Sequence, residues 1–249
     1  MTAAPRGDDR RITLAQTVRL GDVTPRRRLR LDAVARYLQD VAGDDSDDAA
    51  LPAGFGWVLR RIDLDIARLP ALGEELTLET RCTGLGPGAR WAERTTTIAD
   101  PGDAPLVTSR SVWVYVDLTT LAPRALPPEF FAVYGDAVRE HRVSARLVLP
   151  KPDPVAVRSV WPLRRTDIDV YGHVNNAAYW SAVEEWLGGP GHGRRITGAT
   201  IEFGVGIDPS DRCELAILDT DADVTCWFLV GEETRAAARV VFDPSETGR

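Results

Sequence analysis

The 249-residue sequence has only three cysteines, one methionine and three histidines, and it contains no long apolar run. Cys82, Cys213 and Cys226 are odd in number and form no CxxC pair, so neither a disulfide framework nor a zinc knuckle is predicted. No stretch approaches the roughly 20 apolar residues of a membrane-spanning helix. The first residues also lack the apolar centre of a secretory signal. We therefore expect a cytoplasmic protein without a membrane span.

Basic residues are also in the minority, since 30 Lys and Arg face 37 Asp and Glu and Lys151 is the only lysine. Nucleic-acid binding draws most of its affinity from basic residues, so no nucleic-acid partner is expected. His141, His173 and His192 are scattered, which predicts no metal site, and no cofactor motif is found. A GxSxG elbow is missing too, which argues against a Ser-His-Asp hydrolase. The length fits one large domain or two small ones.

Two parts of the chain repeat each other, which decides between these two possibilities. The strand-like segment 57–70 aligns with 196–209 at an offset of 139, which places Ile62 on Ile201. Upstream of each segment, apolar residues recur at spacings of three and four, which indicates a helix with one apolar face. The two helices align at an offset of 145. The six extra residues of the first copy fall in the acidic segment 43–52, which we expect to be a solvated loop.

Each copy is predicted to contain a strand, a long helix and four further strands. The expected strands are 11–20, 56–68, 74–83, 89–99 and 106–117 in the first copy, and 155–165, 196–207, 212–219, 223–230 and 234–242 in the second. Residues 1–118 and 155–249 would form two units, joined by the proline-rich linker 119–154 with a short helix at 129–140. A long helix on an antiparallel sheet is the hotdog arrangement. The prediction is an α+β tandem (double) hotdog fold with sites between the halves.

The densest group of polar residues lies at the start of the second helix and includes Asp169, Gly172, His173, Asn175 and Asn176. A helix N-terminus offers unpaired N–H groups and a positive dipole end, which stabilise an oxygen that gains negative charge. Gly172 would let a carbonyl group approach the backbone closely. Asp169 could act as a nucleophile or as a general base toward water. The alternative is that these side chains only cap the helix.

The first copy serves as an internal control for the capping alternative. There Thr24, Arg28 and Leu31 occupy the positions of residues 169, 173 and 176. The first copy therefore has the helix without the polar set. Caps alone do not predict such an asymmetry, so we expect the chemistry in the second copy and a binding role for the first.

The chain resembles the acyl-acyl carrier protein (ACP) thioesterases of plants and bacteria, which are double hotdog proteins. The similarity runs over nearly the whole chain and is most specific in Asp169-x-x-Gly172-His173-Val-Asn-Asn176. The resemblance implies a thioesterase that hydrolyses fatty acyl-ACP in fatty acid biosynthesis. The same core is similar to that of small hotdog acyl-CoA thioesterases, so coenzyme A thioesters are an alternative substrate.

The sequence also departs from the pattern of that family. The family has Asp, Asn and His at alternate positions, and a Glu and often a Cys in the following strand. Asp169 and His173 match, but Tyr171 stands at the Asn position, and Gly206 and Ile207 stand at the other two. Tyr171 could contribute its hydroxyl group to catalysis. The departures keep open a third reading, an acyl-thioester-binding protein with weakened catalysis.

A hotdog hydratase is disfavoured, because that class has four residues between its Asp and His and Ile168 occupies the required position. For substrate binding, Arg164, Arg165, Arg194 and Arg195 flank the proposed site and could meet the phosphate of a phosphopantetheine arm or an acidic carrier. The same arginines would also suit a solvated face. Association of two chains into a homodimer is left open.

Overall fold

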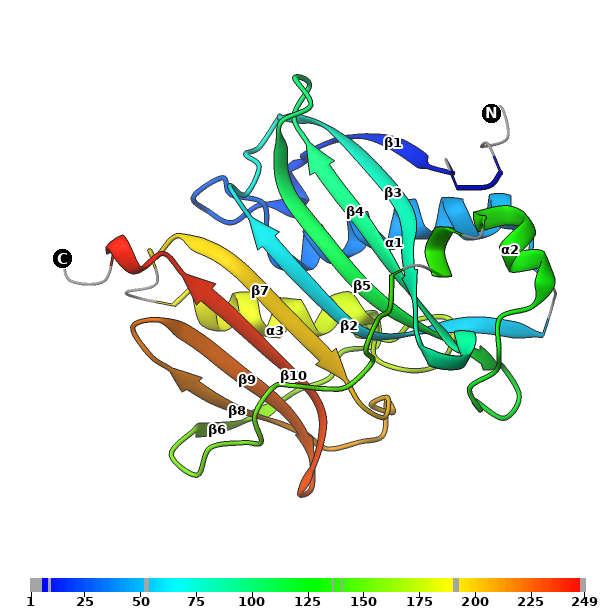
Figure 1. Cartoon of the computed structure of the whole chain (residues 1–249). Coiled ribbons are helices and arrows are strands. Elements are labelled where there is room, and N and C mark those ends of the chain that lie inside the picture. Colours follow the sequence, from blue (N-terminus) through cyan, green and yellow to red (C-terminus); the bar gives the residue numbers. More distant parts are fainter. Residues whose placement is uncertain are drawn as a thin grey trace.

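The computed structural model describes residues 6–8, 10–51, 54–135, 137–139, 141–189 and 193–246. Within this part of the chain, ten strands form one antiparallel sheet in the order β1-β3-β4-β5-β2-β7-β10-β9-β8-β6 (Figure 1). The first five strands are β1 (Ile12–Thr17), β2 (Phe55–Ile66), β3 (Glu75–Leu85), β4 (Trp91–Ala99) and β5 (Pro105–Asp117). The other five are β6 (Val157–Trp161), β7 (Ile196–Phe203), β8 (Cys213–Asp219), β9 (Asp223–Val230) and β10 (Glu233–Phe242). The two halves repeat the same strand order outward from the centre, as the sequence repeat predicts.

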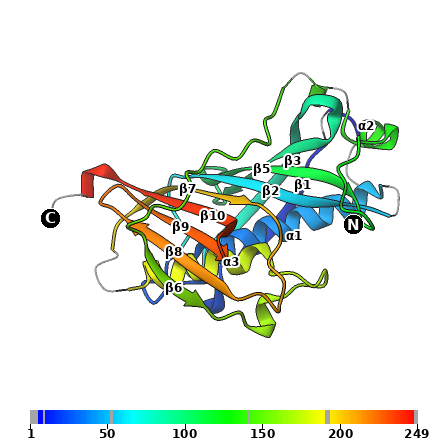
Figure 2. The ribbon, with the colours of Figure 1, turned by 90° about the horizontal axis from the view of Figure 1, so that it is seen from below.

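Two long helices, α1 (Leu31–Ala49) and α3 (Asn176–Leu187), lie side by side on the same face of the curved sheet (Figures 1 and 2). On α1, Val34, Leu38 and Val41 are buried, as the spacing of three and four predicts. On α3 the side chains of Trp180 and Val183 are buried in the same way. The apolar faces of both helices therefore close the core against one continuous sheet. The α+β class is confirmed.

The central pair of strands, β2 and β7, joins the halves around a pseudo-twofold axis. Ile62 lies opposite Ile201 in the register, and Asp63 lies opposite Thr200. Ile62 and Ile201 are also equivalent in the sequence repeat, so the axis passes between them. Both side chains are buried. The interface between the halves is thus an ordinary strand pair in the middle of the sheet.

The loops before the two helices also match at the offset of 145 residues. A short 3₁₀-helix precedes each loop, η1 (Leu20–Asp22) in the first half and η4 (Arg165–Asp167) in the second. Each loop then has one residue with positive φ, Arg27 at 67° and Gly172 at 79°. The two helices begin at equivalent residues. The loop that carries the predicted chemistry is therefore a feature of the fold, and only its side chains distinguish the two copies.

The prediction of a solvated loop at 43–52 is wrong, because α1 continues to Ala49. Asp45 on this part of the helix is buried and accepts hydrogen bonds from Arg10 Nε at 2.9 Å, Arg94 Nη2 at 2.5 Å and Tyr134 Oη at 2.9 Å. The partners of this buried carboxylate, two arginines and a tyrosine, lie 35, 49 and 89 residues away in the sequence. Local composition therefore suggested a solvated segment where the fold has a buried ion-pair network.

The linker after β5 contains α2 (Pro128–Tyr134), which is shorter than the predicted helix 129–140. Its later part crosses the outer face of the second half (Figure 1). There the Trp227 indole donates to the Pro150 carbonyl oxygen at 2.7 Å. The Glu202 carboxylate accepts from the amides of Val148 at 2.6 Å and Leu149 at 3.0 Å. The linker is thus attached to the sheet over this stretch, and the division at 118 and 155 remains a prediction.

Among the described helices, none is both long and apolar enough to cross a membrane.

Candidate active site

Two cavities lie at the N-terminal end of α3. The wider one, about 550 Å³, lies between the two halves and is lined by Gln16, Asp22, Arg36, Tyr37, Gln39, Asp40, Thr166, Asp167, Ile168, Asp169, Asn175, Ala177, Ala178 and Ser181. The narrower one, about 10 Å³, is lined by Ala35, Leu38, Gln39, Leu59, Ile62, Arg94, Thr96, Ser111, Trp113 and Asn176. Gln39 lines both, and Asn175 and Asn176 are adjacent in the chain. The predicted site therefore lies where the two cavities approach each other.

Asp169 is held by the turn that follows it. Its backbone amide donates to the His173 carbonyl oxygen at 2.9 Å, and the Gly172 amide donates to the Asp169 carbonyl oxygen at 3.1 Å. One carboxylate oxygen, Oδ1, accepts from the Tyr171 amide at 2.9 Å. Among the described residues Oδ2 has no hydrogen-bond partner. The carboxylate is thus oriented through one oxygen, and Asp169 lies in the wall of the wider cavity.

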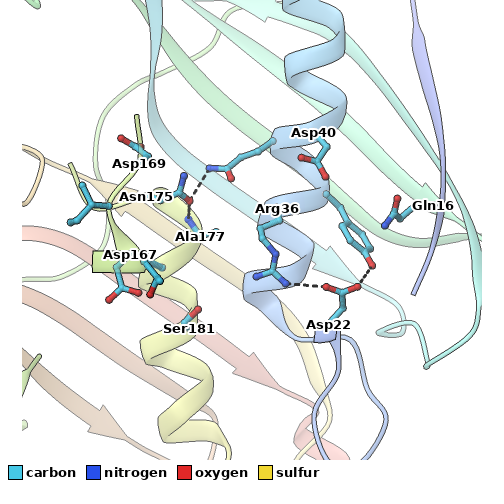
Figure 3. A pocket seen from close by; sticks show the side chains of 14 residues that line it. Gln16, Asp22, Arg36, Asp40, Asp167, Asp169, Asn175, Ala177 and Ser181 are labelled. Atoms are coloured by element: carbon cyan, nitrogen blue, oxygen red, sulfur yellow. Dashed lines mark hydrogen bonds and ion pairs between the residues drawn. The ribbon is translucent and has the colours of Figure 1, made fainter. Parts of the chain in front are cut away.

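At the start of α3, the Ala177 amide is capped by a side chain and the Asn176 amide is not. Asn175 is the N-cap, and its Oδ1 accepts from the Ala177 amide at 2.8 Å and from Gln39 Nε2 at 3.3 Å (Figure 3). The Asn175 amide donates to the Asp167 carbonyl oxygen at 2.7 Å. For the Asn176 amide, no partner is found in the described part of the chain. This N–H is therefore the candidate donor to an oxyanion.

The side chains of Tyr171 and His173 line neither cavity. Tyr171 is 75% exposed, and His173 is also exposed. His173 lies against Gly206, because a Cβ added to Gly206 would be 3.1 Å from the His173 Cδ2 atom. The position of the family's Glu is therefore next to the imidazole, and this chain has no side chain there. Ile207 is buried, and its carbonyl oxygen accepts from the Val174 amide at 3.1 Å.

The four predicted arginines divide into two groups. Arg164 and Arg165 are exposed beside Asp167 at the wider cavity, and the Arg164 amide donates to Asp167 Oδ2 at 2.8 Å. Arg194 and Arg195 follow the C-terminal end of α3, where Arg194 pairs with Asp219 and Arg195 with Asp243. A 12-residue helix is about 18 Å long. The structure therefore brings the first pair to the site and places the second pair at the far end of the helix.

The opposite wall of the wider cavity comes from the first copy. The sequence led us to expect sites between the halves, but none of these first-copy lining residues was among the candidates named from it. Asp22 accepts from Arg36 Nη2 at 3.1 Å and from Tyr37 Oη at 2.8 Å (Figure 3). Burial is the main cause that raises the pKa of Tyr37 to about 12. Partial burial, together with the Asp44 carboxylate, raises the pKa of Asp40 above its usual range. One signal was present in the sequence, since Asp22 is the counterpart of Asp167 in the repeat.

No three His, Cys, Asp or Glu side chains are grouped to hold a metal ion in the described ranges, and His192 lies outside them.

Comparison with known proteins identifies the family. The family described as the acyl-ACP thioesterase N-terminal domain matches residues 13–134, and the acyl-ACP thioesterase C-terminal domain matches residues 151–200. The chain belongs to the acyl-ACP thioesterase family. As a member of this family it is a thiolester hydrolase, which confirms the predicted enzyme class.

Solved structures support the same fold for this acyl-ACP thioesterase family member. An acyl-ACP thioesterase from Bacteroides thetaiotaomicron has a TM-score of 0.79 and 18% identity, with 94% of this chain and 98% of that chain covered. A 12:0-ACP thioesterase from Umbellularia californica has the same TM-score and identity, with 94% and 97% covered. The predicted double hotdog fold is confirmed. The uncharacterized protein Rv2001 of Mycobacterium tuberculosis is 30% identical over 218 residues, 87% of this chain and 86% of that protein.

Proposed function

We propose that this thioesterase hydrolyses fatty acyl-ACP in fatty acid biosynthesis, with Asp169 as its central catalytic residue. The observation that carries the proposal is the position of the Asp169 carboxylate. Its Oδ1 is held by the Tyr171 amide, Asp169 lines the wider cavity, and α3 begins seven residues later at Asn176. A carboxylate beside a helix N-terminus can act on a carbonyl group whose oxygen is held by that N-terminus.

The reaction can be written with these groups. The thioester carbonyl oxygen accepts the Asn176 N–H, and Asp169 Oδ2 takes a proton from a water molecule as that water attacks the carbonyl carbon. The tetrahedral intermediate then collapses, the C–S bond breaks, and the proton on Asp169 passes to the leaving thiolate. The products are a fatty acid and the free thiol of the carrier. Direct attack by the Asp169 carboxylate is the alternative, in which water then hydrolyses the acyl-enzyme anhydride.

The other predicted residues have supporting roles in this proposal. Gly172 forms the positive-φ turn that brings the Asp169 amide to the His173 carbonyl oxygen. Asn175 caps α3 and contacts Gln39 of the first half, so it fixes the helix end on which the carbonyl group rests. Tyr171 and His173 are exposed and line neither cavity. The His173 carbonyl oxygen binds the Asp169 amide, and the proposed role of its imidazole is to exchange protons with solvent beside Asp169.

Arg164 and Arg165 support a carrier protein as the second part of the substrate. The chain carries a net charge of −7, so an acidic partner needs local positive charge to approach. Both arginines are exposed and directly precede Thr166 and Asp167, which line the wider cavity. A comparison of kcat/KM for the acyl-ACP and acyl-CoA thioesters of one fatty acid separates the two carriers. A cytoplasmic location and a homodimer remain predictions.

The role of Asp169 is tested by hydrolysis assays on purified protein. Asp169→Asn is expected to lower kcat by about 100-fold or more, because general base catalysis contributes roughly 10²–10⁴. Thr24→Val is the matched control, since Thr24 is the equivalent position of the first copy, and its rate should stay near that of the unchanged protein. Full activity in Asp169→Asn would remove this residue from the mechanism. Tight acyl-thioester binding without turnover would instead identify a binding protein.

A further inference from the structure

The interior of the N-terminal half contains a strip of polar side chains on the face of the sheet that packs against α1. We call it the polar strip, and it consists of Thr80 on β3, Arg94 and Thr96 on β4, and Ser109 and Ser111 on β5. Four of these residues are buried, and the fifth, Arg94, exposes 13% of its side chain. Interior positions of a sheet that faces a helix are normally apolar.

The C-terminal half shows that the fold does not require this strip. From the central pair Ile62–Ile201, the strand register leads to Ser111 in one half and to Ala238 in the other. The registers of the neighbouring strand pairs extend this correspondence between the two halves to further residues. Thr80, Arg94, Thr96 and Ser109 correspond in this way to Leu215, Cys226, Phe228 and Ala236. All five counterparts are apolar, so the polar strip is a feature of one copy.

Some side chains of the polar strip form hydrogen bonds with one another, and one of them has no partner. The hydroxyl groups of Thr80 and Thr96 are 2.7 Å apart, and Arg94 Nη1 donates to Thr80 Oγ1 at 3.2 Å. Ser109 is only 1% exposed, and among the described residues its Oγ has no hydrogen-bond partner. A buried hydroxyl without a partner is unfavourable, and native proteins contain few of them. Ser109 is therefore a hydroxyl group that can still accept a partner.

The position of the polar strip connects it to the site. Arg94, Thr96 and Ser111 line the narrower cavity together with Asn176 at the start of α3. Ser109 lies directly opposite Thr96 in the strand register. The narrower cavity, at about 10 Å³, holds no more than about one water molecule, so an acyl chain must displace its lining side chains to enter. A chain that extends in this direction from a carbonyl group bound at Asn176 would meet the polar strip within its first few carbons.

We propose that this enzyme selects acyl groups that carry a hydroxyl or keto oxygen near the thioester, rather than saturated chains. The proposal rests on the function proposed above. The oxygen would be bound by Ser109 Oγ and the neighbouring hydroxyl groups. Arg94 is already paired with Asp45 at 2.5 Å, so the polar strip offers neutral hydrogen-bonding groups rather than a free cation. A neutral oxygen therefore fits better than a carboxylate.

The test compares three thioesters of the same chain length and carrier, namely octanoyl, 3-hydroxyoctanoyl and 3-oxooctanoyl. We expect kcat/KM to be at least tenfold higher for one of the oxygenated substrates than for the octanoyl thioester. The comparison of the 3-hydroxy with the 3-oxo substrate shows which oxygen is preferred. Ser109→Ala should reduce this preference about tenfold. Because Ser109 Oγ bonds to no described residue, its removal should leave the fold intact. Thr225→Val on β9, a buried threonine outside the polar strip, is the control and should keep the preference.

Equal or better hydrolysis of the saturated substrate would overturn the inference and leave the thioesterase proposal standing. So would a preference that survives in Ser109→Ala. If no thioester is hydrolysed, the proposed function fails, and binding of non-hydrolysable thioether analogues decides the inference. Tenfold tighter binding of the 3-hydroxy or 3-oxo analogue than of the saturated one would support it, and equal affinities would refute it.

Discussion

His173 has different surroundings from those that the family pattern implies. Gly206 lies against its ring but contributes no carboxylate. We predict that Gly206→Glu raises kcat about tenfold, because a carboxylate hydrogen-bonded to the imidazole would fix its orientation, and such a bond is worth roughly 1.5–3 kcal/mol. Gly206→Gln places a neutral group of the same shape there and should give a smaller gain. If kcat is the same in both variants and in the unchanged protein, His173 takes no part in turnover.

Asp32, near the start of α1, gives a pH-dependent contribution to stability. Burial alone would raise its pKa, but hydrogen bonds from Arg30 and Arg36 outweigh burial and hold the pKa below its usual value. A carboxylate with a lowered pKa stabilises the fold above the unfolded pKa of about 4, and this stabilisation is lost as the pH falls through the folded value.

The corresponding prediction concerns Asp32→Asn. In urea unfolding at pH 7, the variant should be less stable than the unchanged protein, because the paired charge is lost. The difference should shrink toward pH 3, because Asp32 is increasingly protonated in the unfolded chain below its unfolded pKa of about 4, while its lowered pKa keeps it ionised longer in the fold. An equal difference at both pH values would show that the ionised form of Asp32 contributes nothing.

At the scale of elements, the N-terminus of α1 is closed by a residue of α3. The N-cap residue Arg30 makes no side-chain capping bond. Instead Glu184 of α3 is buried and accepts from the Leu31 amide at 2.7 Å and from Arg28 Nη2 at 2.9 Å. The two helices, one from each half, are therefore joined by a buried carboxylate.

We predict that Glu184→Ala lowers the free energy of unfolding by about 3 kcal/mol, since it leaves a buried amide and a guanidinium group without their acceptor. Glu184→Gln keeps one acceptor oxygen and should cost about half as much. Urea unfolding measures both. Glu185→Ala, at the exposed neighbouring position, should stay within about 0.5 kcal/mol of the unchanged protein. A small effect of both Glu184 variants would mean that the helices do not depend on this contact.

The strands were predictable because their alternation and turns are local in the sequence. The second half of α1 was not, since Asp45 depends on partners from three distant segments. At the site, the position of Asp169 beside a helix start followed from the motif. The residues of the first-copy wall of the wider cavity and of the polar strip could not be predicted. They are brought together by the strand register and by the contact of α1 with α3, and neither of these follows from a local sequence pattern. Arg194 and Arg195 were placed at the site by proximity in the sequence, but a helix separates them from it.

For the whole molecule, the central β2–β7 pair predicts that the halves unfold together. Ile201 is fully buried and lies opposite Ile62 on the pseudo-twofold axis. Ile201→Ala should lower the free energy of unfolding by about 2–5 kcal/mol through the cavity it leaves. Hydrogen exchange of peptides from β4 and from β9 should show an equal loss of protection, although the substitution lies in the second half. Loss confined to the second half would show that the two units unfold independently.

Arg28 stands in the first copy where His173 stands in the second, and it binds Glu184. In a symmetric dimer of identical chains, one codon would encode both of these equivalent positions. Such a dimer could not have a histidine at the proposed site of one half and an arginine that joins the helices in the other. Two copies in one chain remove this restriction, so each can change without altering the other. The consequence concerns stoichiometry. Because the first-copy loop has a structural role through Arg28, each chain would hold one catalytic centre. Each chain would therefore bind one acyl thioester, whereas a symmetric pair of hotdog units would bind two.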